Sequence, residues 1–132
     1  PVGSQGASGS TWVKYTKTFT NFSVPSTTQT ITLVTLGAKE YIEAIVMKHS
    51  TAFSDGLALS AHVNLGVTGN NNLFFTNFDA FQAPSNTAFV AGEPIYYTHG
   101  GIAVTITLTS NVNLDTLTAG SIDVSIKTST LP

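Results

Sequence analysis

The side chains that could do chemistry in this sequence are few and scattered. No two of the histidines His49, His62 and His99 have the spacing of a metal-binding pair on one strand or helix. Glu40 and Glu43 are three residues apart in a predicted strand, so they face opposite sides and form no general acid–base pair. The full set of carboxylates is Glu40, Glu43, Asp55, Asp79, Glu93, Asp115 and Asp123. We therefore expect no catalytic residue, no metal and no cofactor; the alternative is a metal-dependent jelly-roll enzyme that gathers the histidines in space.

Other catalytic signatures are missing from the sequence. It contains no cysteine, which excludes a thiolate nucleophile, a disulfide framework and a cysteine-based zinc site. No serine lies in a Gly-x-Ser-x-Gly elbow, and no glycine-rich stretch has the lysine and helix of a phosphate loop. Residues 70–72, three asparagines, supply oxygen donors without an adjacent carboxylate, which indicates a turn and not a calcium site. The sequence thus predicts a protein that is not an enzyme.

Charge is scarce in this chain. Charged residues make up 9% of the sequence and the formal net charge is −2, whereas an ordinary soluble domain has about 25% charged residues. The five basic residues are all lysines, spread singly, so no basic patch for nucleic acid is expected. No apolar run approaches the ~18 residues of a membrane span, and no signal peptide is visible. A polar surface built from Thr, Ser, Asn and Gly favours close contact with neighbouring proteins.

The elements that must position these residues are strands. Residues 1–10 form a Gly/Ser-rich N-terminal arm, which we expect to lie against a surface of this domain or of a neighbour. Residues 11–132 form one domain in which apolar residues recur with a period of two. The runs cover residues 12–19, 30–36, 41–48, 57–67, 73–81, 89–97, 102–109 and 121–127. About eight strands with short turns between them predict an all-β, antiparallel β-sandwich that is jelly-roll-like.

The aromatic residues are the remaining candidates for binding. Trp12 and Tyr15 stand beside the arm, and tryptophan and tyrosine dominate interface energetics. With Val2 and Gly3 of the arm they are the predicted interface residues. Exposed aromatic side chains also serve as platforms for sugars, so a carbohydrate-binding surface is the alternative. The phenylalanines from Phe74 to Phe89 indicate core packing.

A family resemblance rests on five stretches: residues 47–53, 59–61, 67–70, 78–84 and 128–132. From about Trp12 onward the chain resembles the small decoration or cement proteins of tailed bacteriophages, which have a jelly-roll fold. The resemblance implies a structural virion protein on the capsid exterior, made in the host cytoplasm. Its partners would be a major capsid protein of the HK97-like fold and further copies of itself, as a homo-dimer or homo-trimer. The alternative is a carbohydrate- or receptor-binding module of a phage tail or fibre.

Overall fold

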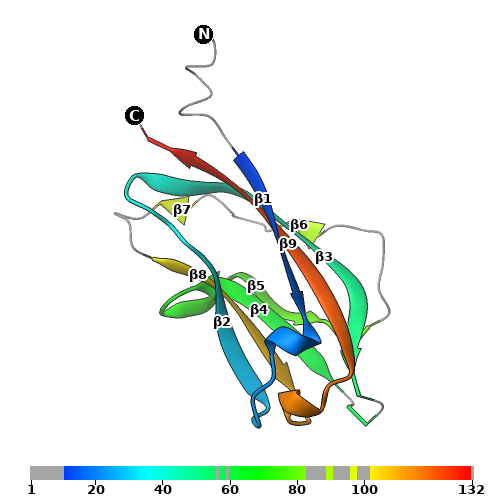
Figure 1. Ribbon diagram of the computed structural model, residues 1–132. Helices are drawn as coiled ribbons and strands as arrows, with labels where there is room; N and C mark the ends of the chain where they lie inside the picture. The colour runs from blue at the N-terminus through cyan, green and yellow to red at the C-terminus, as the bar shows by residue number, and fades with distance from the viewer. Residues whose placement is uncertain are drawn as a thin grey trace.

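The chain folds into two antiparallel sheets packed face to face (Figure 1). The computed structural model describes residues 11–55, 57–58, 60–82, 89–90, 96–97 and 102–131, and these contain nine strands. One sheet has the order β1-β9-β3-β6, with β7 also paired to β3, and the other has the order β2-β8-β4-β5. The all-β, antiparallel β-sandwich predicted from the sequence is confirmed.

Most consecutive strands lie in different sheets, while β4 and β5 share one sheet and β6 and β7 share the other. The five-stranded sheet holds β1 (Thr11–Thr18), β3 (Glu40–Ser54), β6 (Phe89–Val90), β7 (Tyr96–Tyr97) and β9 (Ala119–Thr130). The four-stranded sheet holds β2 (Thr28–Thr35), β4 (Ala61–Val67), β5 (Asn70–Asp79) and β8 (Ala103–Ser110). Two 3₁₀ turns, η1 (Phe19–Asn21) and η2 (Leu114–Thr116), lie between strands of different sheets. Such crossing connections, with the first strand beside the last, are the jelly-roll arrangement.

The core lies between the sheets and follows the period-two pattern of the sequence. The inward residues are fully or almost fully buried on the two central strands β8 (Val104, Ile106, Leu108) and β9 (Ile122, Val124, Ile126). Phe22 and Phe53 pack edge to face in the same core, with ring centroids 6.2 Å apart. Phe74 is buried, and Phe75, Phe78 and Phe81 pack against the cluster. Burial alternates along β9, as a two-sheet sandwich requires, whereas Thr105 and Thr107 on the other side of β8 are buried as well.

The strand predicted over residues 57–67 begins later than expected. Leu57 and Ala58 precede β4, because their backbone N–H groups donate to Asp55 Oδ1 at 2.7 and 2.6 Å. The Asp55 side chain thus closes a turn at a point where the apolar pattern alone predicts a strand. The paired strand starts at Ala61.

The asparagines at 70–72 do not form the turn between β4 and β5. That turn is Thr68-Gly69, and Asn70 already pairs with Val67. The next pair in this direction is Leu65 with Phe75. Between the two pairs β5 has five residue steps and β4 has two, so β5 bulges outward. A Cβ on Gly66 would lie 2.2 Å from the Asn70 carbonyl oxygen, so only glycine fits beneath this bulge.

Gly120 lies inside β9, and the packing requires a glycine there. Its φ is +146°, and a Cβ at this position would lie 2.2 Å from the Phe53 ring. We expect Gly120→Ala to lower the free energy of unfolding by about 2–4 kcal/mol, through overpacking and backbone strain. Urea unfolding followed by tryptophan fluorescence measures the change.

Gly37→Ala is the matched control for this substitution. A Cβ on Gly37 would meet only Glu40 Oε1, at the ordinary contact distance of 3.7 Å. We expect it to change the free energy of unfolding by less than about 1 kcal/mol. Equal losses in the two variants would contradict the packing role of Gly120.

Candidate interaction surfaces

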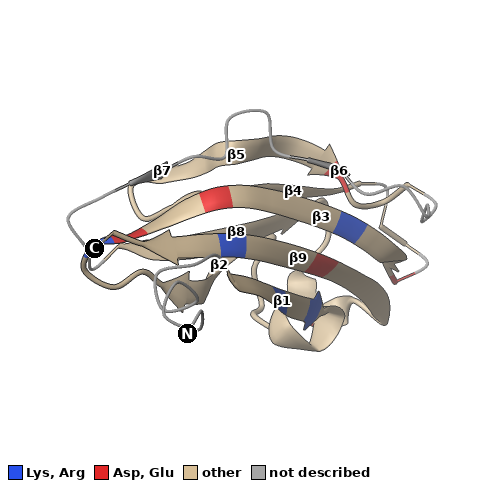
Figure 2. Cartoon of the chain, turned by 90° about the horizontal axis from the view of Figure 1, so that it is seen from above, with Lys and Arg blue, Asp and Glu red and all other residues tan. Residues whose placement is uncertain are grey.

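The two sheets differ in charge. β2, β4 and β8, which the structure describes along their whole length, carry no Lys, Arg, Asp or Glu, and β5 carries only Asp79. The five-stranded sheet carries Lys14, Lys17, Glu40, Glu43, Lys48, Asp123 and Lys127. Figure 2 shows these basic and acidic segments along β1, β9 and β3. Charges dispersed in the sequence are therefore gathered in space, because three strands distant in sequence are neighbours.

The pairing of β9 with β1 and β3 determines which side chains lie next to each other on the charged outer face. Trp12 and Ala44 flank Lys127, while Thr16 and Lys48 flank Asp123. These positions alternate with the buried Ile122, Val124 and Ile126, so they face away from the core. Thr16 Oγ1 donates to Asp123 Oδ1 at 2.6 Å, which ties β1 to β9 on this face.

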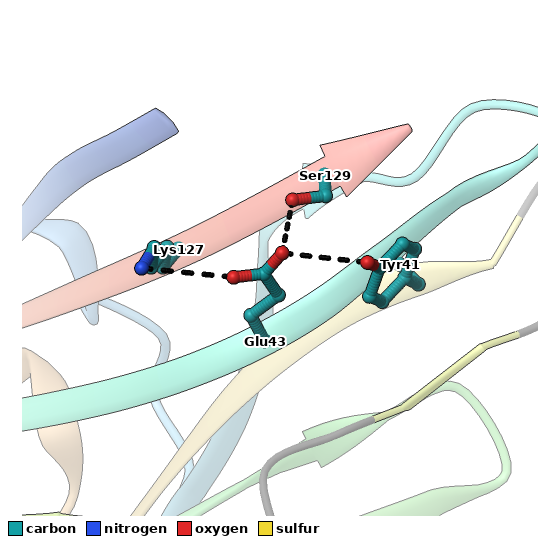
Figure 3. A network of polar contacts seen from close by, with 4 residues as sticks. All are labelled: Tyr41, Glu43, Lys127 and Ser129. Atoms are coloured by element: carbon teal, nitrogen blue, oxygen red, sulfur yellow. Dashed lines mark hydrogen bonds and ion pairs between the residues drawn. The ribbon is translucent and has the colours of Figure 1, made fainter. Parts of the chain in front are cut away.

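A polar cluster on this face is centred on Glu43 (Figure 3). Glu43 lies at a bulge of β3, where the register with β9 shifts between Ile42 and Ala44. Its Oε2 accepts hydrogen bonds from Ser129 Oγ and from Tyr41 Oη, the latter at 3.4 Å. Its Oε1 lies 3.6 Å from Lys127 Nζ. The bulge allows one carboxylate to reach groups on both strands.

The cluster braces two strands and has no arrangement for nucleophilic catalysis. Ser129 is only 5% exposed, so a substrate has little access to its hydroxyl. The Lys127 amine is ion-paired with the other carboxylate oxygen of Glu43. Glu40 contacts a different group, because its Oε1 accepts the Gly37 N–H at 2.8 Å. The two glutamates therefore do not form a pair, as the sequence predicted.

The predicted interface residues do not form one surface. Trp12 lies on the outer face of β1 and is 51% exposed. Tyr15 lies on the other side of the strand, partly buried against the core, and burial, reinforced by the negative charge of Glu40, raises its phenol pKa. Val2 and Gly3 lie outside the described residues. Of these four residues, Trp12 is the one whose side chain the structure shows to be largely exposed, and its role as a contact residue stays a prediction.

The start of β1 exposes apolar side chains in both directions. Val13 shares the inward side with Tyr15, yet it is 42% exposed. Leu131, just past the end of β9, is 41% exposed at the same end of the sheet, since Thr11 pairs with Thr128. Sequence reasoning missed Val13, because alternation predicts which side a residue faces but not how far the opposing sheet extends. The exposed apolar groups thus meet where residues 1–10 join the domain.

The histidines are not brought together in the described part of the chain. His49 is 1% exposed in the core, stacked on Phe53 and edge-on to Phe78, with ring centroids 6.4 and 5.8 Å away. His62 lies on the outer side of β4 opposite Asp79, and His99 is outside the described residues. Among the residues described, no three of His, Asp and Glu are grouped to hold a metal ion. No helix in that part is long and apolar enough to cross a membrane.

Burial of His49 makes folding depend on pH. Desolvation lowers the pKa of its imidazole, and the backbone of Thr51 and Ala80 and the charge of Asp79 oppose this only in part. Neither ring nitrogen has a hydrogen bond of good geometry among the described residues, so these backbone contacts do not offset the desolvation of the charged ring. The unfolded chain binds the extra proton first, near pH 6.5. The contribution of His49 to the free energy of unfolding is therefore complete above that pH. It decreases as the pH falls below that value, because protonation then favours the unfolded chain.

We expect the wild-type chain to lose on the order of 1 kcal/mol of unfolding free energy per pH unit just below pH 6.5, through His49. His49→Leu removes this loss, and urea unfolding at pH 7.5 and pH 5.5 measures it. His62→Gln, on the outer side of β4, is the control and retains the loss assigned to His49. An unchanged pH dependence in His49→Leu would contradict the assignment.

Comparisons with known proteins agree on the fold. No protein-family model and no curated protein matches the chain. A chain of the cyanophage Pam1 capsid asymmetric unit is similar, with a TM-score of 0.69 and 15% identity over 93% of this chain and 86% of that one. A chain of the acid-stable capsid of Helicobacter pylori bacteriophage KHP30 has a TM-score of 0.65 and 15% identity over 96% and 90%. The chain shares its fold with proteins found in phage capsids.

Proposed function

We propose that this chain is a structural protein of a bacteriophage virion that decorates and cements the outside of the capsid shell, without catalysis. The observation that carries the proposal is the shared sandwich, which covers 93% and 96% of this chain in the two phage-capsid comparisons. The surface supports it as well. Among the described residues no three of His, Asp and Glu are grouped to hold a metal ion, and the few charges leave one sheet almost neutral.

The proposed partner is a major capsid protein of the HK97-like fold. Residues 1–10, with Val2 and Gly3, would contact it together with Trp12, because the arm joins the domain at the exposed apolar end of β1. An arm of this length buries backbone and small apolar groups across a junction between shell subunits. Each contact is weak, and many copies on one shell give the cementing effect.

The four-stranded sheet suits contact between copies of this chain, as a homo-dimer or homo-trimer. Its outer side exposes Thr28, Thr30 and Thr32. The hydroxyl of Thr30 hydrogen-bonds with that of Thr107, with 2.7 Å between their oxygens, so cross-strand contacts hold these groups in rows. Contact through neutral hydroxyl groups is little affected by salt.

Deleting residues 1–10 tests the cementing role. We expect the truncated chain to bind shells of its phage at least tenfold more weakly, because the arm supplies part of the contact. Its melting temperature should stay within about 2 °C of that of the full chain, because no described core residue is lost. Co-sedimentation with shells lacking this protein measures binding, and calorimetry measures melting.

A chain whose arm is replaced by ten alternating glycines and serines serves as a length-matched control. It separates the arm's own residues from the mere presence of a tether, and we expect it to bind like the truncated chain. Equal binding of truncated and full-length chains would remove the arm from the mechanism. Failure of the full-length chain to bind shells at all would overturn the cementing function.

One observation favours a second function, binding of a host polysaccharide by a tail or fibre module. Trp12, the single tryptophan of the chain, is exposed on a flat sheet face beside Lys127, as a sugar platform would be. Titration of the protein with the polysaccharide, followed by Trp12 fluorescence, decides between the two. A cement protein shows no saturable change, and a sugar-binding module does.

A further inference from the structure

We infer that the outward edge of β1 accepts an added β-strand from another polypeptide, and that this strand is acidic. The inference rests on the proposed function for the identity of that polypeptide, a protein of the phage shell. The site itself is argued from four features of β1. We call it the β1 edge: the side of Thr11–Thr18 that faces away from β9.

The first feature is an unpaired backbone. β1 stands at the end of its sheet and pairs with β9 alone, through eight consecutive residue pairs from Thr11 to Thr18. Backbone N–H and C=O groups on its outer side have no strand partner among the described residues. Such a row is a template on which an extended peptide forms ladder hydrogen bonds.

The second feature is regularity, in which β1 differs from the other edges. β2 is also at an edge, but its register shifts between Thr32 and Val34. β5 carries the large bulge over Gly66, and β6 and β7 have only two residues each. Bulges and short strands are devices that prevent strand addition. Of the described edge strands, β1 is the long one whose register is unbroken.

The third feature is apolar surface on both sides of the edge. Trp12 and Val13 face opposite sides of the sheet and are both exposed. A strand added beside them would find an apolar side chain on each of its two faces. This arrangement adds side-chain burial to the backbone hydrogen bonds.

The fourth feature is charge, and it determines the kind of partner. β1 carries Lys14 and Lys17 and no acidic residue, and neither lysine has an ion-pair partner among the described residues. The neighbouring Asp123 already accepts the Thr16 hydroxyl. A two-fold pairing of β1 with a second copy would place four lysines and no acid in one ribbon, which like-charge repulsion opposes. Glutamate or aspartate on the incoming strand complements these lysines.

Lysines on an edge have another common use, which is to prevent edges from pairing at all. The two roles differ in what happens when a lysine is reversed. Lys14→Glu weakens binding if Lys14 contacts an acidic strand. The same change permits self-association, seen by sedimentation velocity, if Lys14 only keeps copies apart, and that result would overturn the inference.

The control variant is Lys39→Glu. Lys39 is an exposed lysine in the turn before β3, so the substitution changes the net charge by the same amount away from the β1 edge. Against shells lacking this protein, we expect Lys14→Glu to bind at least tenfold more weakly and Lys39→Glu to bind within twofold of wild type. Similar weakening in both variants would mean that overall charge, and not the β1 edge, governs binding.

Hydrogen–deuterium exchange reports on the backbone directly. In the free protein, the β1 amides that do not point toward β9 should exchange rapidly, and on shells they should slow at least tenfold. Shell binding without this protection at Thr11–Thr18 overturns the inference and leaves the proposed function standing.

If the wild-type chain binds no shell, the proposed function fails. Strand addition at the β1 edge is then tested with a peptide. An acetylated peptide of the repeat Thr-Glu-Val is added to nitrogen-15-labelled protein, and the same peptide with Lys in place of Glu is the control. Shifts of the β1 amides with the acidic peptide alone support the site. No shift, or equal shifts with both peptides, overturns it.

Discussion

The insertion of β9 between β1 and β3 is the contact on which the rest of the structure depends. β9 closes the five-stranded sheet by pairing with both strands along most of its length. Its inward residues Ile122, Val124 and Ile126 complete the core. The same pairing leaves β1 at the edge and brings the exposed ends of β1 and β9 together. The core, the free edge of β1 and the exposed apolar end of the sheet all depend on how β9 pairs with β1 and β3.

Irregularities in β3 adapt this sheet to its surroundings. The bulge at Glu43 turns a carboxylate toward Ser129 and Lys127, which ties β3 to β9 near the end of the chain. At the other end, Gly120 leaves room for the Phe53 ring, so β9 can begin directly above the core.

The fold distributes the few charged residues unequally between the two sheets. One sheet presents neutral hydroxyl and amide groups, whereas the other carries most of the lysines and acids of the described residues. Within the charged sheet most acids already contact a partner, but Lys14 and Lys17 do not form ion pairs with described residues. The fold thus gives the chain two different surfaces, a nearly neutral sheet and an edge strand with two lysines and no acid.

Patterns among residues close together in the chain were enough to predict the strands and the inward residues of β8 and β9. The same alternation, applied to residues three apart, separates Trp12 from Tyr15 as it separates Glu40 from Glu43.

Which strands become neighbours depends on the packing of the whole chain. Pairing between β1 and β9 joins residues more than a hundred positions apart, and no local pattern encodes that choice. The gathering of charges on one sheet follows from it, while the bulge at Glu43 belongs to the pairing of β3 with β9. Side-chain alternation has a range of a few residues, whereas sheet order is set by how two whole faces pack together.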